Sequence, residues 1–351
     1  MRISKETLSL IEDIERRIDP DIEADLEKQW LDFTYDRFDG EIFCPERKRI
    51  SVSGVDLPGI NINDAVKDYD LMLRSQLSGV SWSLNGTHNT PCIRANYGTG
   101  IMTSLLGAEI FIMPYENNTL PTTRPLNDGE KIREIIENGV PNLMNGFGKN
   151  VLEFGEMCSE IFEKYPKIKR FVNVYHPDTQ GPLDVCELLW GCEMFYAFYD
   201  DPDLAHSILS LITDTYITFM DKWYELFPRN SVLSHHWGNL CHKGSIVLRS
   251  DSAMNISPEI YREFSAPYDQ KLLDYYDGGI VHFCGRGDHY IDILSEIKGL
   301  YGINMSQPEL NDMEKIYRNT VDKGIKLLGF NHTRALADID RPGGFNHCLS
   351  V

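Results

Sequence analysis

Hydrophobic and polar positions follow two periods along this chain, and the change from one to the other predicts its elements. Residues 5–18 place Leu8, Ile11, Ile14 and Ile18 at helical spacing, which predicts an N-terminal helix. Further along, short apolar runs bounded by turn residues suit buried parallel strands. These runs are residues 80–84, 109–113, 171–176, 231–237, 280–284, 301–305 and 325–330.

Amphipathic helices are predicted between these strands, and several have readable ends. Asp201-Pro202 and Ser257-Pro258 combine a capping side chain with proline in the first turn. Asn311 can cap a later helix and Gly324 can end it. Repeated alternation of strand and helix favours a single (β/α)8 barrel over two domains. We expect residues 1–50 to form an N-terminal helical extension and residues 51–351 to form the barrel.

The run Gly278-Gly-Ile-Val-His-Phe-Cys-Gly285 contains a candidate metal site. Side chains alternate faces along a strand, so His282 and Cys284 point to one side and Val281 and Phe283 to the other. An imidazole and a thiol on one face suit zinc. The alternative is a buried histidine and a buried thiol in an ordinary core strand.

Composition narrows the class of function. The 351 residues are 42% hydrophobic and carry a net charge of −19, which argues against a nucleic-acid partner because phosphate binding needs clustered Lys and Arg. The eight cysteines lack disulfide-framework spacing, the N-terminus is polar, and no apolar run reaches membrane-spanning length. We therefore expect a cytoplasmic protein with reduced thiols and no membrane partner.

A set of motifs resembles the uroporphyrinogen decarboxylase superfamily, whose fold is a (β/α)8 barrel. The matching stretches are residues 180–191, 201–202, 250–264, 267–268, 282–285 and 303–308. The arginine-containing N-terminal segment of the true decarboxylases is missing, so binding eight porphyrinogen carboxylates in this acidic chain would be costly. The resemblance is closest to the methylcobamide:coenzyme M methyltransferase branch, which holds zinc through His-x-Cys and a distant Cys. It implies the ligands His282, Cys284 and Cys348, with Cys241 as the alternative third ligand.

This resemblance implies a zinc-dependent methyltransferase. It would move a methyl group between a corrinoid, carried by a separate protein, and a small-molecule donor or acceptor such as a thiol. Two alternatives remain open. One is a decarboxylase-like lyase that acts on another carboxylated substrate without metal, and the other is a corrinoid or tetrapyrrole binder without catalytic activity.

Further residues are candidates for the mouth of the predicted barrel, where strands end. Asp251 matches an acidic superfamily position, and His236 lies at the end of a predicted strand, so both are candidate catalytic residues. His236 and its neighbour His235 could also simply pack or face solvent. The candidate substrate-binding residues are Tyr97, Asp178, Gln180, His235 and Gln307.

Overall fold

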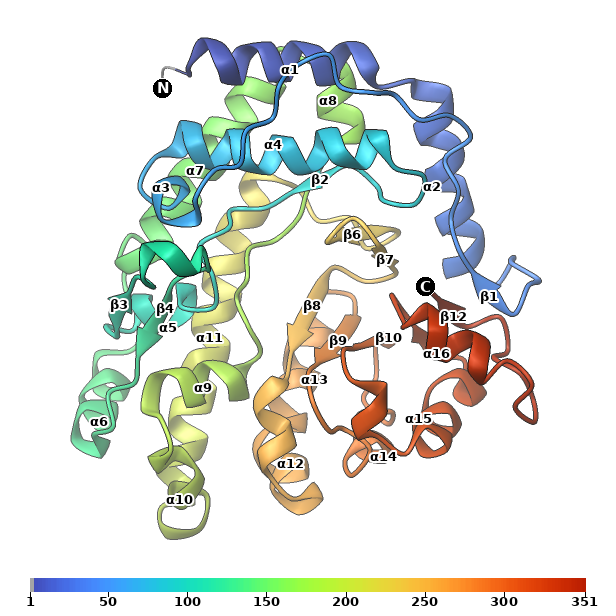
Figure 1. Ribbon diagram of the computed structural model, residues 1–351. Coiled ribbons are helices and arrows are strands. Elements are labelled where there is room, and N and C mark those ends of the chain that lie inside the picture. Colours follow the sequence, from blue (N-terminus) through green and yellow to red (C-terminus); the bar gives the residue numbers. More distant parts are fainter. Residues whose placement is uncertain (1–2) are drawn as a thin grey trace.

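A six-stranded parallel sheet organises the C-terminal half of the protein. The computed structural model describes residues 3–351. Every neighbouring pair in the sheet is parallel, including the pair that joins the first strand of the chain to the last (Figure 1). In spatial order the strands are β1 (Ile42–Phe43), β12 (Leu349–Ser350), β11 (Lys326–Leu327), β10 (Leu300–Met305), β9 (Gly279–Phe283) and β8 (Ile246–Arg249).

Two more parallel strands, β2 (Cys92–Ile93) and β5 (Asn173–Val174), form a separate pair. Isolated hydrogen bonds connect the strand β5 segment to β8: the backbone N–H of Val247 donates to His176 Nε2 over 2.9 Å, and that of Gly181 donates to Arg249 O over 2.8 Å. The predicted α/β class with a parallel sheet is confirmed. The ladders among residues 3–351 do not themselves close into a ring of eight strands.

Three predicted parallel strands have other structures. Residues 109–113 and 231–237 contribute to antiparallel hairpins, in which β3 (Glu109–Phe111) pairs with β4 (Thr122–Arg124) and β6 (Ser234–His236) pairs with β7 (Leu240–His242). Residues 80–84 lie in helix α4 (Tyr69–Asn85). Leu77, Val80 and Leu84 are all buried there, so the apolar residues of this run follow the helical period rather than the strand period.

The two faces of the main sheet pack against different layers. Leu248, Val281 and Phe283 belong to the main core, which also contains residues of helices α12 (Pro258–Phe264) and α13 (Ala266–Tyr275). Val247 and Ile280 belong to a second core with the β6–β7 hairpin and helix α2 (Pro20–Thr34). Side-chain alternation therefore places His282 on the hairpin side of the sheet.

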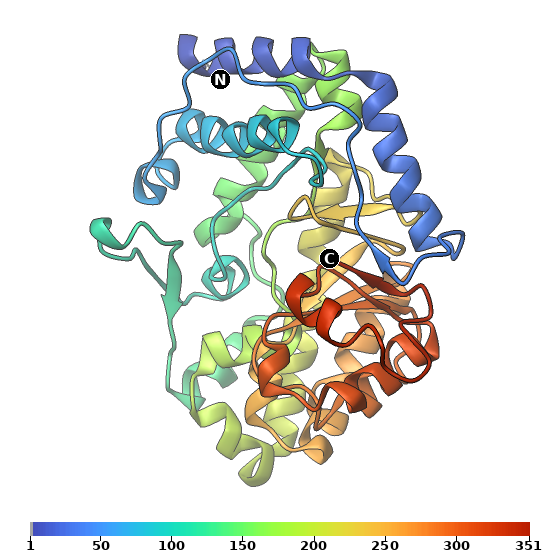
Figure 2. The same cartoon turned by 45° about the vertical axis from the view of Figure 1, so that its right-hand side comes forward.

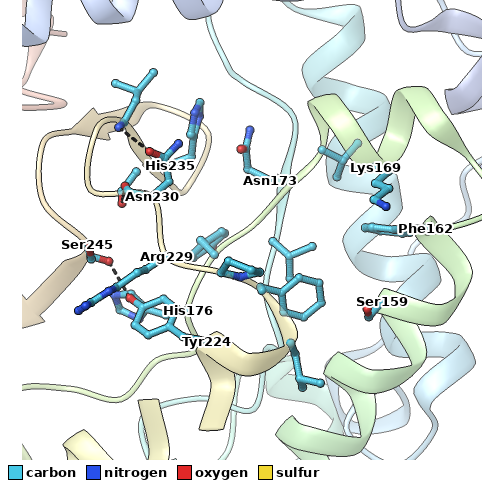
Figure 3. Close-up of a pocket in the computed structure, with 18 of the residues that line it drawn as sticks. Ser159, Phe162, Lys169, Asn173, His176, Tyr224, Arg229, Asn230, His235 and Ser245 are labelled. Carbon is cyan, nitrogen blue, oxygen red and sulfur yellow. Dashed lines mark hydrogen bonds between the residues drawn. The ribbon is translucent and has the colours of Figure 1, made fainter. Parts of the chain in front are cut away.

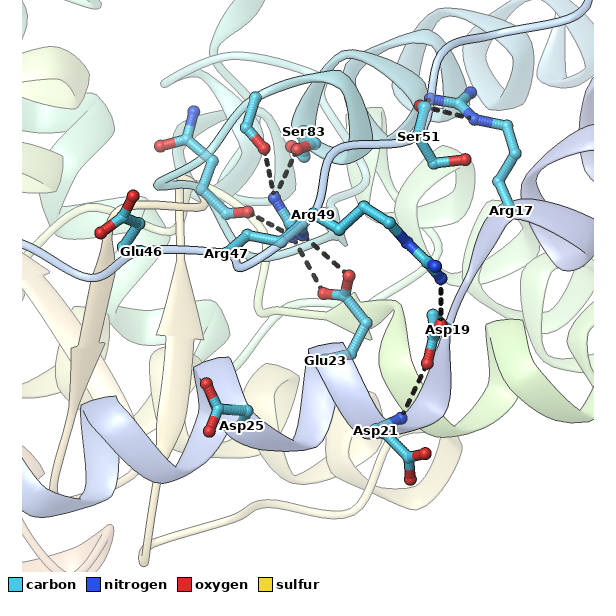
Figure 4. Close-up of polar contacts among 12 residues, drawn as sticks. Arg17, Asp19, Asp21, Glu23, Asp25, Glu46, Arg47, Arg49, Ser51 and Ser83 are labelled. Carbon is cyan, nitrogen blue, oxygen red and sulfur yellow. Dashed lines mark hydrogen bonds and ion pairs between the residues drawn. The ribbon is translucent and has the colours of Figure 1, made fainter.

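The predicted N-terminal helix is confirmed as α1 (Lys5–Arg17), where Ser4 accepts a capping hydrogen bond from the N–H of Thr7. Helices α1 and α2 meet at an angle along one edge of the molecule, beside α4 and α8 (Pro166–Phe171) (Figure 2). Arg47 anchors the following segment: its guanidinium pairs with both carboxylate oxygens of Glu23, at 2.8 and 2.9 Å, and donates to three backbone carbonyls (Figure 4).

The remaining helices cover the strands and their connections. Asp201 and Ser257 cap helices α11 and α12 as predicted, whereas Asp312 rather than Asn311 caps α15. No helix within residues 3–351 is long and apolar enough to cross a membrane. The other α-helices are α3 (Ile62–Ala65), α5 (Ile101–Leu105), α6 (Gly129–Asn138), α7 (Gly146–Phe162), α9 (Pro182–Trp190), α10 (Glu193–Asp200), α11 (Pro202–Leu226), α14 (Ile291–Leu294), α15 (Met313–Asn319) and α16 (His332–Ala337).

Candidate functional site

Three side chains at the C-terminal ends of β8 and β9 converge into one group, which we call the ligand group: Asp251, His282 and Cys284. Their ligand atoms all lie within 4.8 Å of one another. His282 is the fourth residue of β9, Cys284 directly follows the strand, and Asp251 lies two residues beyond the end of β8. Among residues 3–351 this is the one group of three or more His, Cys, Asp or Glu side chains close enough to hold a metal ion.

The spacing within the ligand group fits a tetrahedral zinc ion. His282 Nε2 lies 3.3 Å from Cys284 Sγ and 3.7 Å from Asp251 Oδ1. Zinc bonds of about 2.0–2.3 Å at tetrahedral angles require ligand atoms roughly 3.3–3.8 Å apart. An imidazole nitrogen, a sulfur and a carboxylate oxygen are all zinc ligands. The three residues could therefore hold zinc and leave a fourth position open.

Asn304 on β10 fixes the orientation of the histidine. The Asn304 amide donates to Leu328 O over 2.7 Å, so its Oδ1 faces His282 Nδ1 at 2.6 Å and accepts a hydrogen bond from it. The proton of the imidazole is thus held on Nδ1, and the lone pair of Nε2 faces the thiol and the carboxylate. Such an outer hydrogen bond orients metal-ligating histidines in proteins generally.

Asp251 is held in place from both sides. Its Oδ1 accepts the backbone N–H of Cys284 over 2.6 Å, which ties the end of β8 to the end of β9. The buried carboxyl of Asp184 on α9 accepts the N–H groups of Asp251 and Ser252 over 2.9 and 2.8 Å. Burial, reinforced by the Asp251 carboxylate, raises the pKa of Asp184 to about 8, so this carboxyl carries a proton at neutral pH.

The loop after Cys284 is clamped by polar side chains from the β10 side. Gln307 Oε1 accepts the N–H of Gly285 over 2.5 Å, and Asn311 Oδ1 accepts those of Gly287 and Asp288. The predicted substrate-binding residue Gln307 thus lies directly beside the ligand group, where it supports the loop. Cys284 Sγ lies 3.4 Å from the hydroxyl of Ser306.

The protonation of the ligand group follows from its burial. Burial lowers the pKa of His282, and the Asp251 carboxylate only partly opposes this shift, so the imidazole is neutral at neutral pH. Burial and the same carboxylate raise the pKa of the Cys284 thiol, which is therefore protonated before a metal binds. Loading zinc onto this group would release the thiol proton.

Four other histidines, which we call the histidine group, lie just after β5 and on the β6–β7 hairpin: His176, His235, His236 and His242. All four are buried, and burial lowers the pKa of each, to about 3 for His176 and His235 and to about 4 for His242. His235 and His236, predicted at the site, belong to this group. One nitrogen of each has a partner: His235 Nδ1 contacts Thr90 and Cys241, each at 3.3 Å, and His236 Nδ1 lies 3.1 Å from His242 Nε2, whereas His236 Nε2 has no partner among the described residues.

A cavity of about 450 Å³ reaches the histidine group from the side of α7 and α11 (Figure 3). Asn173, His235 and Ser245 line it together with His176 and His236. Ser245 precedes β8, so the cavity opens toward the N-terminal ends of the strands, whereas the ligand group lies at their C-terminal ends. The sequence prediction had placed His235 and His236 at the same mouth as His282.

Cys348, the predicted third zinc ligand, is not part of the ligand group. It precedes the short strand β12, and its buried thiol lies 3.6 Å from Lys326 Nζ at the start of β11. Parallel pairing places Lys326 level with Gly302 and Ile280, and Ile280 lies two residues before His282 in β9. In the sheet, β11 and β10 separate Cys348 from β9. Asp251, predicted as catalytic, is the third member of the ligand group instead. The alternative candidate Cys241 contacts His235.

The predicted substrate-binding residues divide into two sets. Asp178 and Gln180 follow β5; Gln180 donates to Asp178, and Arg249 Nε pairs with Asp178 over 2.8 Å. Arg249 is the β8 partner of His282 in the sheet register, so Asp178 lies near the ligand group. Tyr97, in contrast, packs against Phe147 within the main core.

Sequence reasoning missed several residues of this site. Asn304 and Arg249 both interrupt apolar strands with a polar side chain, and this departure from the strand pattern was the available signal. Trp237 contacts both Arg249, over a distance of 4.8 Å to the ring centroid, and His282, with ring centroids 5.5 Å apart. Its position depends on the hairpin turn after β6, where Trp237 has a φ of 51°, and a parallel-strand prediction could not include that turn.

Comparisons with known proteins support the fold of this chain. No protein-family model and no curated protein matches it. Among solved structures, it is similar to a methyltransferase from Methanosarcina mazei, with a TM-score of 0.62 and 18% sequence identity. The similarity covers 86% of this chain and 81% of that chain. At this identity the likeness establishes a shared α/β fold over most of both chains.

Proposed function

We propose that this protein is a zinc-dependent methyltransferase that moves a methyl group between a corrinoid and a small substrate or thiol. The observation that carries the proposal is the convergence of Asp251, His282 and Cys284 at the carboxyl ends of two neighbouring parallel strands. The likeness to a solved methyltransferase adds support at the level of the fold. It also supports the proposal of a (β/α)8 barrel of the uroporphyrinogen decarboxylase superfamily, in which the hydrogen bonds from the β5 segment to β8 join the two parallel sheets.

The roles of the residues follow from their contacts. His282, Cys284 and Asp251 would hold the ion. Asn304 keeps the His282 Nε2 lone pair available, and the Cys284 N–H fixes Asp251 Oδ1. A zinc ion bound here would act as a Lewis acid that favours the thiolate form of a sulfur at its open position. The corrinoid would be carried by a separate protein that docks over these strand ends.

A metal-free lyase is the second candidate, and Asp184 favours it. This carboxyl is protonated at neutral pH and accepts the backbone N–H of Asp251, so it is a candidate proton donor beside the site. Both of its oxygens already accept backbone N–H groups, however, which restricts it to a supporting position. Metal content separates the two candidates.

The test is a metal analysis combined with a methyl-transfer assay. We expect purified protein reconstituted with zinc to hold one ion per chain and to accelerate the demethylation of free methylcobalamin by a small thiol. Protein stripped with a chelator should lose this activity and regain it when zinc is restored. Protein that binds no zinc under these conditions would rule out the proposed mechanism and leave the lyase as the leading candidate.

A further inference from the structure

The Arg249 side chain lies beside the ligand group, and four of its five N–H donors are unused. It ends β8 in register with His282, and its side chain is only 4% exposed. Its Nε pairs with Asp178 Oδ1 over 2.8 Å. Neither Nη1 nor Nη2 has a hydrogen-bond partner among residues 3–351, and both atoms are buried.

The charges around Arg249 do not balance. Arg94 Nη1 also pairs with Asp178, through Oδ2 at 3.2 Å, so two guanidinium groups share one carboxylate. Gln180 donates to that same carboxylate and adds no charge. The Asp251 carboxylate belongs to the ligand group and would serve the metal ion. One positive charge therefore remains uncompensated in a buried position, which is costly unless an anion completes it.

Arg47 provides an internal comparison, because its side chain is equally buried, at 1% exposure. Its guanidinium is bidentate to Glu23, and its remaining donors are used by three carbonyl oxygens (Figure 4). This is how the chain satisfies an arginine with a structural role. Arg249 lacks every one of these additional partners within the described part of the chain.

A buried guanidinium with two free nitrogens is typical of a site for a carboxylate, sulfonate or phosphate group.

We propose that Arg249, supported by Arg94 through Asp178, binds an anionic group of the small-molecule substrate. This inference rests on the proposed function, since it assigns the anionic group to the molecule that reacts at the ligand group. Trp237 contacts both Arg249 and His282, so the anionic end and the reacting end of the substrate lie around one indole ring. The substrate is therefore a compact molecule with a carboxylate, sulfonate or phosphate close to its reacting atom.

Calorimetric titration with acetate, methanesulfonate and inorganic phosphate tests this proposal, with acetamide and dimethyl sulfone as neutral counterparts. We expect at least one anion to bind more tightly than its neutral counterpart, and the order among the three identifies the anionic group. Arg249→Gln should weaken that binding by about tenfold to a hundredfold, the value of a hydrogen bond to a charged group. Asp178→Asn should strengthen it, because it removes the competing carboxylate. A general loss of folding cannot produce both results.

Arg318→Gln is the matched control, since this arginine is 70% exposed and pairs with Glu314 on α15; it should leave anion binding unchanged. Equal binding of anions and neutral compounds, or unchanged binding by Arg249→Gln, would overturn the inference. The titrations need no methyl transfer and can be run with and without zinc. Anion binding without zinc binding would therefore refute only the proposed function, and zinc-dependent transfer without anion binding would refute only this inference.

Discussion

The ligand group contains a cysteine beside a histidine, and the histidine group has Cys241 beside His235, yet only the ligand group suits a metal. In the ligand group, Asn304 occupies the far nitrogen of His282, and the near nitrogen faces a thiol and a carboxylate. In the histidine group, both nitrogens of His176 have backbone partners, and those of His242 contact Lys243 O and His236 Nδ1. Free lone pairs that converge on one point, rather than the proximity of histidine and cysteine, distinguish a candidate metal site.

Burial makes the same distinction. Cys241 and His235 are 3.3 Å apart, as close as Cys284 and His282, but Cys241 is fully buried and burial raises the pKa of its thiol well above the usual range. Cys284 is only partly buried, so a metal ion and a substrate can approach it. A thiol sealed in the core contributes packing, whereas an accessible one can act as a ligand.

The largest expected effect comes from exchanging the two cysteines for alanine in turn. Cys284→Ala leaves the ligand group with two donors, and we expect it to lose most of its zinc. Cys241→Ala should keep one zinc per chain and instead lower the free energy of unfolding by about 1 kcal/mol, because a buried sulfur is removed. Metal analysis after dialysis measures the zinc content, and urea unfolding measures the free energy of unfolding. Zinc loss in Cys241→Ala would make the histidine group the metal site.

The second prediction concerns acid. Burial lowers the pKa of His176 and His235 to about 3 and that of His242 to about 4, below the ordinary 6.5, so the unfolded chain binds protons that the folded protein does not. Stability should therefore fall as pH drops from about 6.5 toward 4, by about 1.4 kcal/mol per pH unit for each such histidine. Asp184 and Asp269, with pKa values raised to about 8 and about 7, act in the opposite direction throughout this range.

The histidines outnumber these two carboxyls, so we expect a net loss of stability, measured as the urea midpoint at pH 7, 6, 5 and 4.5. His235→Asn should reduce the slope, since one fewer buried imidazole then resists protonation. A midpoint that stays constant, or rises, as pH falls through this window would show that the histidine group is protonated without penalty. Burial would then not distinguish the imidazoles of the histidine group from accessible ones.

The sequence indicated the ligand group better than it indicated its surroundings. Alternation along residues 280–284 is a local property of the strand, so the separation of His282 and Cys284 from Val281 and Phe283 was readable in advance. The third ligand depended on which strand ends meet in space. Asp251 reaches the group because β8 pairs with β9, whereas Cys348 lies across two further strands, and no local pattern encodes that order.

The same reasoning explains the errors in the fold. Residues 231–237 have the composition of a buried strand, and they form one, but its partner is the following strand β7 in an antiparallel hairpin. The choice is made by the turn, where Trp237 and Gly238 both have positive φ values, of 51° and 79°. That turn moves His235 and His236 away from the mouth at which the ligand group lies and into the histidine group.

A third prediction tests the support of the ligand group. Asn304→Ala removes the partner that holds the His282 proton on Nδ1, and we expect zinc affinity to fall by about tenfold to a hundredfold. The matched change in the histidine group is Thr90→Val, which removes a contact of His235 and should leave zinc affinity unaffected. Competition with a fluorescent chelator measures both. Equal affinity in the two variants would mean that Asn304 does not orient a metal ligand.

The smallest expected effect on zinc belongs to Cys348. Its thiol contacts Lys326 rather than the ligand group, so Cys348→Ala should change zinc affinity by no more than about twofold, the typical independence of distant sites. The variant should lose about 1 kcal/mol of stability, because the thiol is 2% exposed at the start of β12. Cys348→Ser, which keeps an acceptor for Lys326, should recover part of that loss. A tenfold or greater loss of zinc affinity in both variants would return Cys348 to the ligand set in place of Asp251, and it would require the end of β12 to approach β9 when the metal binds.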